Sequence, residues 1–336
     1  MLSDRDALTR LMAREDLTRE ETEALFGRLM DGEVPEPVQA ALLVALRIKG
    51  ESRAEITGAA AAMRARVTAI PHRRGDLIDT CGTGGDGRGT FNISTAAALV
   101  AAAGGAAIAK HGNRSVSSRS GSADVLAALG VPIEVEPEQA ARALDEIGIA
   151  FLFAPRLHPA MKHAMPVRRA LGVRTLFNVL GPLTNPAGAR RQLMGVYAPE
   201  LVELLAGVLA DLGSEHALVV HGSDGLDEIT TTGPTRVAEV RHGRVEVYDL
   251  DPRDLDLELA PPAALAGGDP EHNAALMRSL LAGEGGPLAD VVALNAAAAL
   301  YVAGVVADLR DGLALARAAL AAGKAKEKLE HLARFR

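Results

Sequence analysis

A segment rich in glycine and hydroxyl side chains, DTCGTGGDGRGTFNIST (residues 79–95), joins an apolar run to a predicted helix. Glycine lets bare backbone approach a ligand, so that several N–H groups converge on one anion. The helix expected after Asn92 adds free N–H groups and the positive end of its dipole. Ser94 and Thr95 in its first turn add hydroxyl donors. The segment therefore predicts a phosphate site.

The same glycines match the spacing G-x-G-x-x-G of a dinucleotide-binding fingerprint, at Gly82, Gly84 and Gly87. That fingerprint packs its third glycine against the helix start, whereas several residues separate Gly87 from the helix here. It also requires an acid about 20 residues further on. The chain has Lys110 and His111 at that place, and it has no Gly-Lys-Ser/Thr of a P-loop. The match therefore indicates phosphate and not a dinucleotide.

A second segment, KHGNRSVSSRSGS (residues 110–122), follows the next apolar run and precedes another predicted helix. It gathers one lysine, one histidine, two arginines, an asparagine and several serines. All of these side chains donate hydrogen bonds, and the cations strengthen them toward phosphate. Each alone would ordinarily be a solvated loop residue, but such a concentration favours a polyanion site.

Charged residues further along the chain are less informative by themselves. Asp227 and Glu228 follow the apolar run HALVVHG, and two adjacent acids in a loop are usually solvated. Beside a diphosphate, however, such a pair would suit Mg²⁺, which prefers carboxylates, substrate oxygens and water. The segment HPAMKHAMPVRRALGVR offers cations that on a helix would mostly be surface charges: His158, Lys162, His163, Arg168, Arg169 and Arg174.

The elements that must position these residues change in type along the chain. Residues 1 to about 70 have helical patterns alone, and the capping boxes Thr18-x-x-Glu21 and Ser52-x-x-Glu55 open two of the helices. From about residue 76, short apolar strands alternate with alanine-rich helices, which implies parallel strands with helices on the sheet faces. Strands are expected at 76–81, 106–111, 148–154, 191–198 and 216–222. Helices are expected after Asn92 and Ser122 and at 137–147, 199–212 and 270–323, with a hairpin in 236–262.

Composition argues against several classes of protein. The 336 residues carry a net charge of −7, and the aromatic content is 3% with no tryptophan, which disfavours nucleic acid and membrane surfaces as partners. Cys81 is the only cysteine, so an internal disulfide and a cysteine metal cage are excluded. The N-terminus lacks the apolar core of a signal peptide, and the apolar runs are too short to span a bilayer. We therefore expect a cytoplasmic protein.

Several blocks of this sequence resemble the anthranilate phosphoribosyltransferase family, and the resemblance runs through the whole chain. The blocks are GTGGD, NIST, KHGNRSVSSRSGSADVLAALG, PVRRALGVRTLFNVLGPLTNP and GSDGLDEIT, of which KHGNR is the most specific. The resemblance implies transfer of the phosphoribosyl group from 5-phosphoribosyl 1-diphosphate (PRPP) to anthranilate, the second step of tryptophan biosynthesis. N-(5-phosphoribosyl)anthranilate and diphosphate are the products, and Mg²⁺ is the cofactor.

The resemblance also implies the fold and the assembly. It is an α/β fold with a small N-terminal all-helical domain, residues 1–70, joined by part of 165–185. A large α/β domain, residues 71–336, follows with a mainly parallel central sheet flanked by helices. The helical domain is implied to form the contact of a homodimer, and the active site is implied to lie in the cleft between the two domains.

Roles in the site follow from the positions that match the family's motifs. The residues implied to bind PRPP are Gly82, Gly85, Asp86, Thr90, Asn92, Ile93, Ser94, Thr95, Lys110, His111, Gly112, Asn113, Arg114, Ser115, Val116, Ser117, Ser118 and Ser122. Those implied for anthranilate are Gly82, Asn113, His158, Arg168, Gly181 and Pro182, with Arg168 holding the carboxylate. Ser94, Asp227 and Glu228 are implied to hold Mg²⁺, and Lys110, His111 and Arg168 to serve catalysis. His111 is the candidate general base, although a histidine among phosphate donors could instead bind a phosphate oxygen.

Two other functions fit parts of the pattern. A pyrimidine nucleoside phosphorylase-like enzyme shares the fold but has a different sequence at the Lys110 segment. A non-enzymatic nucleic-acid-binding relative would show a basic surface and losses in the Mg²⁺ or KHGNR positions. Because the chain is acidic and every motif block is intact, the sequence favours the transferase.

Overall fold

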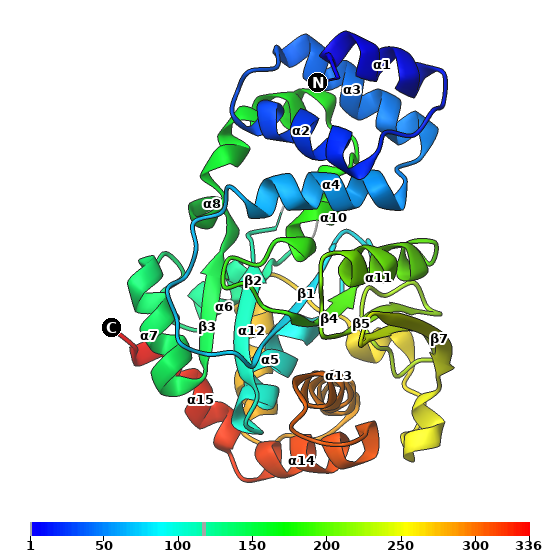
Figure 1. Cartoon of the computed structure of the whole chain (residues 1–336). Coiled ribbons are helices and arrows are strands. Elements are labelled where there is room, and N and C mark those ends of the chain that lie inside the picture. Colours follow the sequence, from blue (N-terminus) through cyan, green and yellow to red (C-terminus); the bar gives the residue numbers. More distant parts are fainter. Residues whose placement is uncertain (1, 116–118) are drawn as a thin grey trace.

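The N-terminal part of the chain is entirely helical. A computed structural model describes residues 2–115 and 119–336 (Figure 1). Both predicted capping boxes are confirmed, because Thr18 and Ser52 each accept the backbone N–H three residues on, from Glu21 and Glu55. The helices are α1 (Asp4–Met12), α2 (Arg19–Met30), α3 (Glu36–Lys49) and α4 (Arg53–Arg64).

A seven-stranded sheet organises the rest of the chain, with strand order β3-β2-β1-β4-β5-β6-β7. The first five strands in this order are parallel, and β6 and β7 are added as an antiparallel hairpin. The expected fold class and the five predicted parallel strands are therefore confirmed. The strands are β1 (Leu77–Gly82), β2 (Ala107–Gly112), β3 (Ile149–Phe153), β4 (Arg191–Gly195), β5 (His216–Gly222), β6 (Thr235–Arg241) and β7 (Arg244–Leu250).

Helices cover both faces of the sheet. They are α5 (Ile93–Ala103), α6 (Ser122–Ala128), α7 (Pro137–Ile147), α11 (Leu201–Asp211), α12 (Pro270–Leu281), α13 (Pro287–Ala303), α14 (Leu309–Ala321) and α15 (Lys324–Arg334). The prediction ended the last helical region at residue 323, which was wrong. Gly323 takes a positive φ of 71° there and starts α15, whose Ala325, Leu329 and Leu332 are buried at helical spacing.

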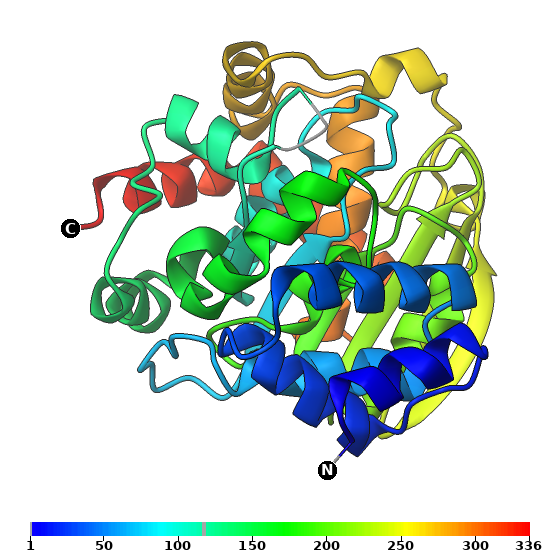
Figure 2. The same ribbon diagram turned by 90° about the horizontal axis from the view of Figure 1, so that it is seen from above.

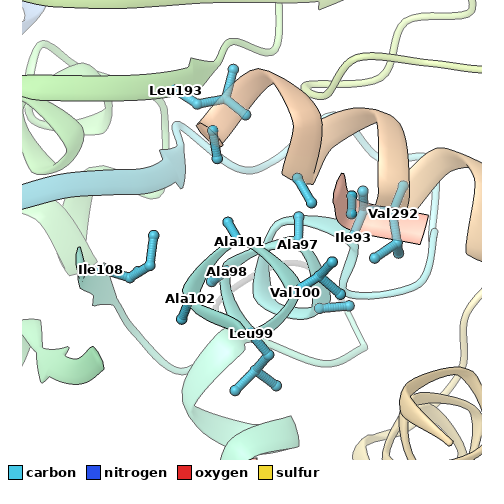
Figure 3. Packing of buried hydrophobic residues seen from close by; sticks show 14 of the residues in the cluster. Ile93, Ala97, Ala98, Leu99, Val100, Ala101, Ala102, Ile108, Leu193 and Val292 are labelled. Carbon is cyan, nitrogen blue, oxygen red and sulfur yellow. The ribbon is translucent and has the colours of Figure 1, made fainter. Parts of the chain in front are cut away.

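The period-two alternation of the strands sorts side chains between the two faces. Ile78, Ile108 and Leu193 pack in one hydrophobic cluster with α5 and α13. Their chain neighbours point to the other face. Leu77 packs with α7. Met194 packs with α11 and the N-terminal helices. Figure 3 shows α5 with Ile108 and Leu193 of the sheet on one side and Val292 of α13 on the other. The many buried alanines of α5 and α13 let the two helices approach closely.

The connection from β3 to β4 packs against the N-terminal helices rather than crossing the sheet directly. Its pieces are α8 (Ala154–Leu157), η1 (Pro159–His163), α9 (Met165–Leu171), α10 (Phe177–Leu180) and η2 (Gly181–Leu183). Helix α9 contacts α3, η1 contacts α2 and α10 contacts α4. The Phe177 ring lies 5.7 Å from that of Phe26, centroid to centroid. Figure 2 shows this green segment beside the blue N-terminal helices.

Candidate active site

The two predicted anion-binding segments meet at the carboxyl edge of the sheet. Strand β1 pairs with β2 on one side and with β4 on the other, so the strand order reverses there. Ligands of open parallel sheets bind outside the carboxyl ends of the strands at such a point. The first segment leaves β1 after Gly82, and the second contains the end of β2 at Gly112.

The glycine loop after β1 presents free backbone donors. Gly84 and Gly85 take φ values of 65° and 80°, which only glycine adopts without strain. The Gly84 N–H donates to Asp227 Oδ2 at 2.9 Å. The N–H groups of Gly85, Asp86 and Gly87 have no acceptor among the described residues. Successive unpaired N–H groups in such a turn form a concave site for an anion.

The acidic pair lies against this loop because two glycines make room for it. Gly82 of β1 and Gly195 of β4 are paired in register. A Cβ atom on Gly195 would lie 1.5 Å from the Asp227 carbonyl oxygen, so the backbone at Asp227 crosses directly over β4. The next residue, Glu228, accepts the Ser94 N–H at the start of α5 at 3.2 Å. The predicted metal residues Ser94, Asp227 and Glu228 are thus brought together.

The electrostatics of this group show an excess of buried negative charge. Burial, and then the charge of Asp86, raises the pKa of Asp227 to about 7. Burial, and then Asp227, raises the pKa of Glu228 to about 8. The buried Asp86 Oδ2 has no hydrogen-bond partner among the residues that the structure describes. A divalent cation would relieve this repulsion and stabilise the ionised carboxylates.

These residues fit Mg²⁺ shared with a substrate better than a closed protein metal site. In the described ranges, no group of three His, Cys, Asp or Glu side chains is arranged to hold a metal by itself. Mg²⁺ is commonly bound by one or two carboxylates together with substrate phosphates and water. The donors present at this edge, two carboxylates and the Ser94 hydroxyl, match that pattern.

Lys110 provides the buried positive charge of the site. Its Nζ donates to the Thr80 carbonyl oxygen and lies 3.5 Å from Ser94 Oγ. Burial lowers the pKa of Lys110, while Asp79 and, more weakly, Glu228 oppose that shift. The ammonium group therefore lies between the β1 backbone and the start of α5, on the same side as the acidic pair.

Several other predicted PRPP residues offer less than their type suggested. The side chains of Ile93 and Thr95 are buried, so they leave only backbone groups for a ligand. The Asn92 amide is already used on both sides, because Nδ2 donates to the Ser120 carbonyl and Oδ1 accepts from Asn273. Thr90 lies in an isolated bridge with Ala266. This part of the site depends mainly on backbone donors and on loop packing.

The described part of the second segment folds onto the start of α6. Asp124 pairs with the Arg114 guanidinium at 3.1 Å and accepts the Ser115 N–H at 2.9 Å. Ser122 Oγ donates to the Asn113 carbonyl at 3.3 Å, directly beside Gly112. The remaining predicted residues of this segment, Val116, Ser117 and Ser118, lie outside the described residues.

His111 faces the β3–β4 connection rather than the glycine loop. Its Nε2 lies 3.1 Å from His158 Nε2, and its ring also makes a hydrogen bond with the Gly181 backbone. Burial is the main cause that lowers the pKa of His111 to about 3 and that of His158 to about 4. Both imidazoles are therefore neutral near pH 7. Pro182 follows Gly181 in the chain, and its carbonyl oxygen accepts a hydrogen bond from Gln192 Nε2 at 2.6 Å.

Arg168 is a half-buried cation that has no carboxylate partner among the described residues. Its guanidinium lies 5.3 Å from the centre of the Phe177 ring, and burial lowers its pKa. The neighbouring Arg169 is exposed, as expected for adjacent positions of one helix. An unpaired, partly desolvated guanidinium beside an aromatic ring suits a planar aromatic carboxylate.

Sequence reasoning missed residues that support the site from behind. Asp79, fully buried in β1, accepts the His111 N–H at 3.1 Å through one oxygen and Asn185 Nδ2 at 2.8 Å through the other. An acid inside the apolar run LIDTC was the available signal. Arg174 was weighed only as one of six cations. It donates to the Gly85 carbonyl and lies over the Tyr197 ring, 3.9 Å from its centre.

Comparison with known proteins gives full-length matches. Residues 74–326 match the glycosyl transferase family, α/β domain, and residues 5–67 match the helical bundle domain of that family. The anthranilate phosphoribosyltransferase of Symbiobacterium thermophilum is 54% identical over 330 residues, which cover 98% of this chain and 97% of that protein. That of Anaeromyxobacter sp. (strain Fw109-5) is 55% identical over 326 residues, covering 97% and 96%.

Solved structures give the same result. The crystal structure of anthranilate phosphoribosyltransferase from Thermus thermophilus superposes with a TM-score of 0.93 at 51% identity, covering 98% of this chain and 99% of that one. The Saccharomyces cerevisiae enzyme in complex with PRPP and Mg superposes with a TM-score of 0.82 at 28% identity, covering 98% and 92%.

Proposed function

Since the chain belongs to the anthranilate phosphoribosyltransferase family, we propose how its own residues carry out that reaction. The enzyme transfers the 5-phosphoribosyl group from PRPP to anthranilate, giving N-(5-phosphoribosyl)anthranilate and diphosphate, in the second step of tryptophan biosynthesis. The observation that carries the assignment of roles is the meeting of three groups at one sheet edge. These are the unpaired N–H groups of the glycine loop, the ammonium of Lys110, and the half-buried acids Asp227 and Glu228.

The diphosphate of PRPP binds over the glycine loop. The N–H groups of Gly85, Asp86 and Gly87 supply donors, and the start of α5 at Ser94 adds a hydroxyl and the positive end of a helix. Within the described residues, the segment from Lys110 to Ser115, with Ser122, covers the ligand from the β2 side. The donors are already fixed in space, so they stabilise the negative charge that grows as diphosphate leaves.

Ser94, Asp227 and Glu228 would hold Mg²⁺, with oxygens of the diphosphate as further ligands. The metal would supply positive charge against the leaving diphosphate, which is the main electrostatic demand of this reaction. Two half-buried carboxylates whose pKa values are raised by desolvation and by neighbouring carboxylates support this assignment. The structure of the yeast relative in complex with PRPP and Mg supports Mg²⁺ as the cofactor.

Anthranilate binds between the β2 end and the β3–β4 connection. Arg168 holds the carboxylate, and the aromatic ring lies among Gly82, Asn113, His158, Gly181 and Pro182. Support comes from the unpaired guanidinium of Arg168 and from the short His111–His158 contact, which brings the connection against the end of β2. A family relative in complex with 4-fluoroanthranilate agrees with a site for an aromatic carboxylate.

Lys110, His111 and Arg168 serve the chemical step in different ways. Departure of diphosphate leaves positive charge at the ribose C1, which the aryl amine nitrogen attacks. Lys110 balances the charge of the leaving group and Arg168 orients the attacking amine. The amine loses its proton late, after its bond to C1 has formed, and water or the released diphosphate takes that proton, so a strong base is not required. The neutral His111 orients the amine rather than acting as an efficient base.

The proposed domains are residues 1–70, joined by part of 165–185, and residues 71–336. Contacts of α9 with α3 and of α10 with α4 support the first unit. The homodimer contact is proposed on the helical domain, where Met12 of α1 and Ile48 of α3 are 73% and 68% exposed. In the described ranges no helix is long and apolar enough to cross a membrane. The cytoplasmic location and the absence of nucleic-acid binding stay predictions.

The reaction is tested by following the loss of anthranilate fluorescence after mixing protein, anthranilate, PRPP and Mg²⁺, with EDTA as the control. A decay that needs all four components supports the proposed function. No decay with folded protein contradicts it. Phosphate-dependent cleavage of pyrimidine nucleosides, and then nucleic-acid binding, would be measured next.

A further inference from the structure

Arg174 joins the β3–β4 connection to the glycine loop. It lies between α9 and α10, in a stretch held on one side by the left-handed turn at Gly172 and on the other by the buried Thr175. Its guanidinium lies over the Tyr197 ring, 3.9 Å from the centroid, and donates a hydrogen bond to the Gly85 carbonyl. The side chain is thus fixed by a stack and by a directed bond at the same time.

Tyr197 is itself tied to the same loop. Its N–H donates to Thr83 Oγ1 at 3.0 Å, and the Thr83 N–H donates to the Gly195 carbonyl at 2.9 Å. The ring that supports Arg174 is therefore anchored to β4 and to the first loop residue. Arg174 and Tyr197 form a clamp on the glycine loop, which we name the Arg174 clamp.

The hydrogen bond from Arg174 restrains the orientation of one peptide unit, the one between Gly85 and Asp86. A trans peptide is planar, so its C=O and N–H groups point in opposite directions. The Gly85 carbonyl points toward Arg174, and the N–H of the same peptide, which belongs to Asp86, therefore points away from it. That N–H is one of the unpaired donors of the loop. Without this hydrogen bond, glycine at position 85 would leave the orientation of this peptide less restricted.

We propose that Arg174 is a positioning residue that fixes the Gly85–Asp86 peptide so that the Asp86 N–H faces the diphosphate of PRPP. This rests on the proposed function, since it assumes that the loop binds the diphosphate. Arg174 acts through the backbone and does not touch the ligand. Tyr197 contributes by holding the guanidinium plane.

The test compares Arg174→Ala, Arg174→Lys, Tyr197→Leu, Tyr197→Phe and the double variant Arg174→Ala/Tyr197→Leu. Arg174→Ala raises KM for PRPP about 10-fold, the effect of losing one good hydrogen bond. In Arg174→Ala, KM for anthranilate and the melting temperature stay near the wild-type values. Tyr197→Leu gives a similar rise, Tyr197→Phe almost none, and Arg174→Lys an intermediate one, because lysine keeps a donor but cannot stack as a plane.

Two controls separate positioning from simple loss of structure. Arg241→Ala removes a comparable arginine from the Tyr301 ring, 6.0 Å from its centre, on a distant strand, and leaves both KM values unchanged. Added methylguanidinium restores part of the PRPP affinity of Arg174→Ala but not of the double variant, which lacks the supporting ring. Additive effects of the two single changes would mean that Tyr197 does not act through Arg174, which overturns the proposed clamp.

Binding of inorganic diphosphate with Mg²⁺, measured by calorimetry, gives a result that does not depend on turnover. Weaker binding by Arg174→Ala supports the clamp, and equal binding overturns it. A wild-type protein without transferase activity would contradict the proposed function. The diphosphate-binding measurement would still decide the role of Arg174.

Discussion

Gly195 and Asp227 lie in direct contact, so that a Cβ atom on Gly195 would be 1.5 Å from the Asp227 carbonyl oxygen. The contact is with backbone, which cannot move aside as a flexible side chain would. It fixes where the chain crosses the end of β4, and hence where the carboxylates of Asp227 and Glu228 lie relative to the glycine loop. One glycine of the sheet therefore determines the position of the proposed metal ligands.

The change Gly195→Ala displaces the Asp227 backbone away from β4. A displacement of about 1 Å near the reacting groups costs about 100-fold in rate. We expect kcat/KM with saturating Mg²⁺ to fall by at least that factor while circular dichroism shows an intact fold. Gly75→Ala is the matched control, because a Cβ there meets nothing within 4 Å. Equal activity of both variants would show that the Gly195 contact does not position the acids.

The acidic pair makes the metal-free protein less stable as the pH rises. In the folded state the pKa values are raised to about 7 for Asp227 and about 8 for Glu228, above their ordinary values of 3.8 and 4.5. The folded state thus holds protons that the unfolded state has lost, and this stabilisation is present below about pH 4 and is lost as the pH rises through 7 to 8.

Melting temperatures measured across this pH range with EDTA and with Mg²⁺ check this expectation. Asp227→Asn with Glu228→Gln should flatten the decline in EDTA. Mg²⁺ should stabilise the unchanged protein more at pH 8 than at pH 5, and should stabilise the double variant at neither pH. A Mg²⁺ effect that survives in the double variant would place the metal elsewhere.

Arg168 and Arg169 are adjacent arginines with different surroundings, which makes them a matched pair. Arg168 is half-buried beside Phe177, whereas Arg169 is exposed. Loss of a hydrogen bond to a charged group costs about 1.5–3 kcal/mol, which corresponds to about 10- to 100-fold. We expect Arg168→Ala to raise KM for anthranilate by that factor with little change in KM for PRPP. Arg169→Ala should leave both KM values unchanged. If Arg168→Ala changed KM for both substrates to a similar degree, Arg168 would not be the residue that binds the anthranilate carboxylate.

The exposed apolar side chains of Met12 and Ile48 test the proposed subunit contact. Isolated exposed hydrophobic residues are common, but helices α1 and α3, which carry these two, pack side by side. If this surface forms the homodimer, Ile48→Glu should convert a dimer into a monomer in sedimentation velocity measurements. Val245→Glu, on the distant edge strand β7, is the control and should leave the mass unchanged. If the wild-type protein were a monomer, the proposed homodimer would be refuted.

The elements of the fold could be predicted because their signals are local. The capping boxes at Thr18 and Ser52 and the apolar runs of β1 to β5 depend on residues near each other in the chain. The end of the helical region was misplaced because Gly323 suggested a stop, although it only turns the chain into α15. Short-range patterns do not distinguish a final stop from a turn between helices.

The support of the site could not be predicted, because it depends on contacts between distant segments. Nothing local indicates that Gly195 lies under Asp227 or that Arg174 reaches the Gly85 carbonyl. Motif matching selected Thr95 as a ligand residue from its type and position, whereas the helix turns its side chain inward. Residue type predicts which chemistry is available, and packing decides which atoms are presented.

The His111–His158 pair should affect both the acid stability of the protein and its catalysis. Burial, as the main cause, holds the pKa of His111 at about 3 and that of His158 at about 4, below the ordinary value of 6.5. Stabilisation from neutral burial is therefore present above about pH 6.5 and is lost as the pH falls through 4 to 3. His158→Gln should reduce this acid-side loss of stability, measured by denaturant unfolding.

Loss of an efficient general base costs about 100-fold or more in rate, so His111→Asn should lower kcat by less than that. An NMR titration of the His111 imidazole near pH 6.5, or a larger fall in kcat, would restore His111 as a working base.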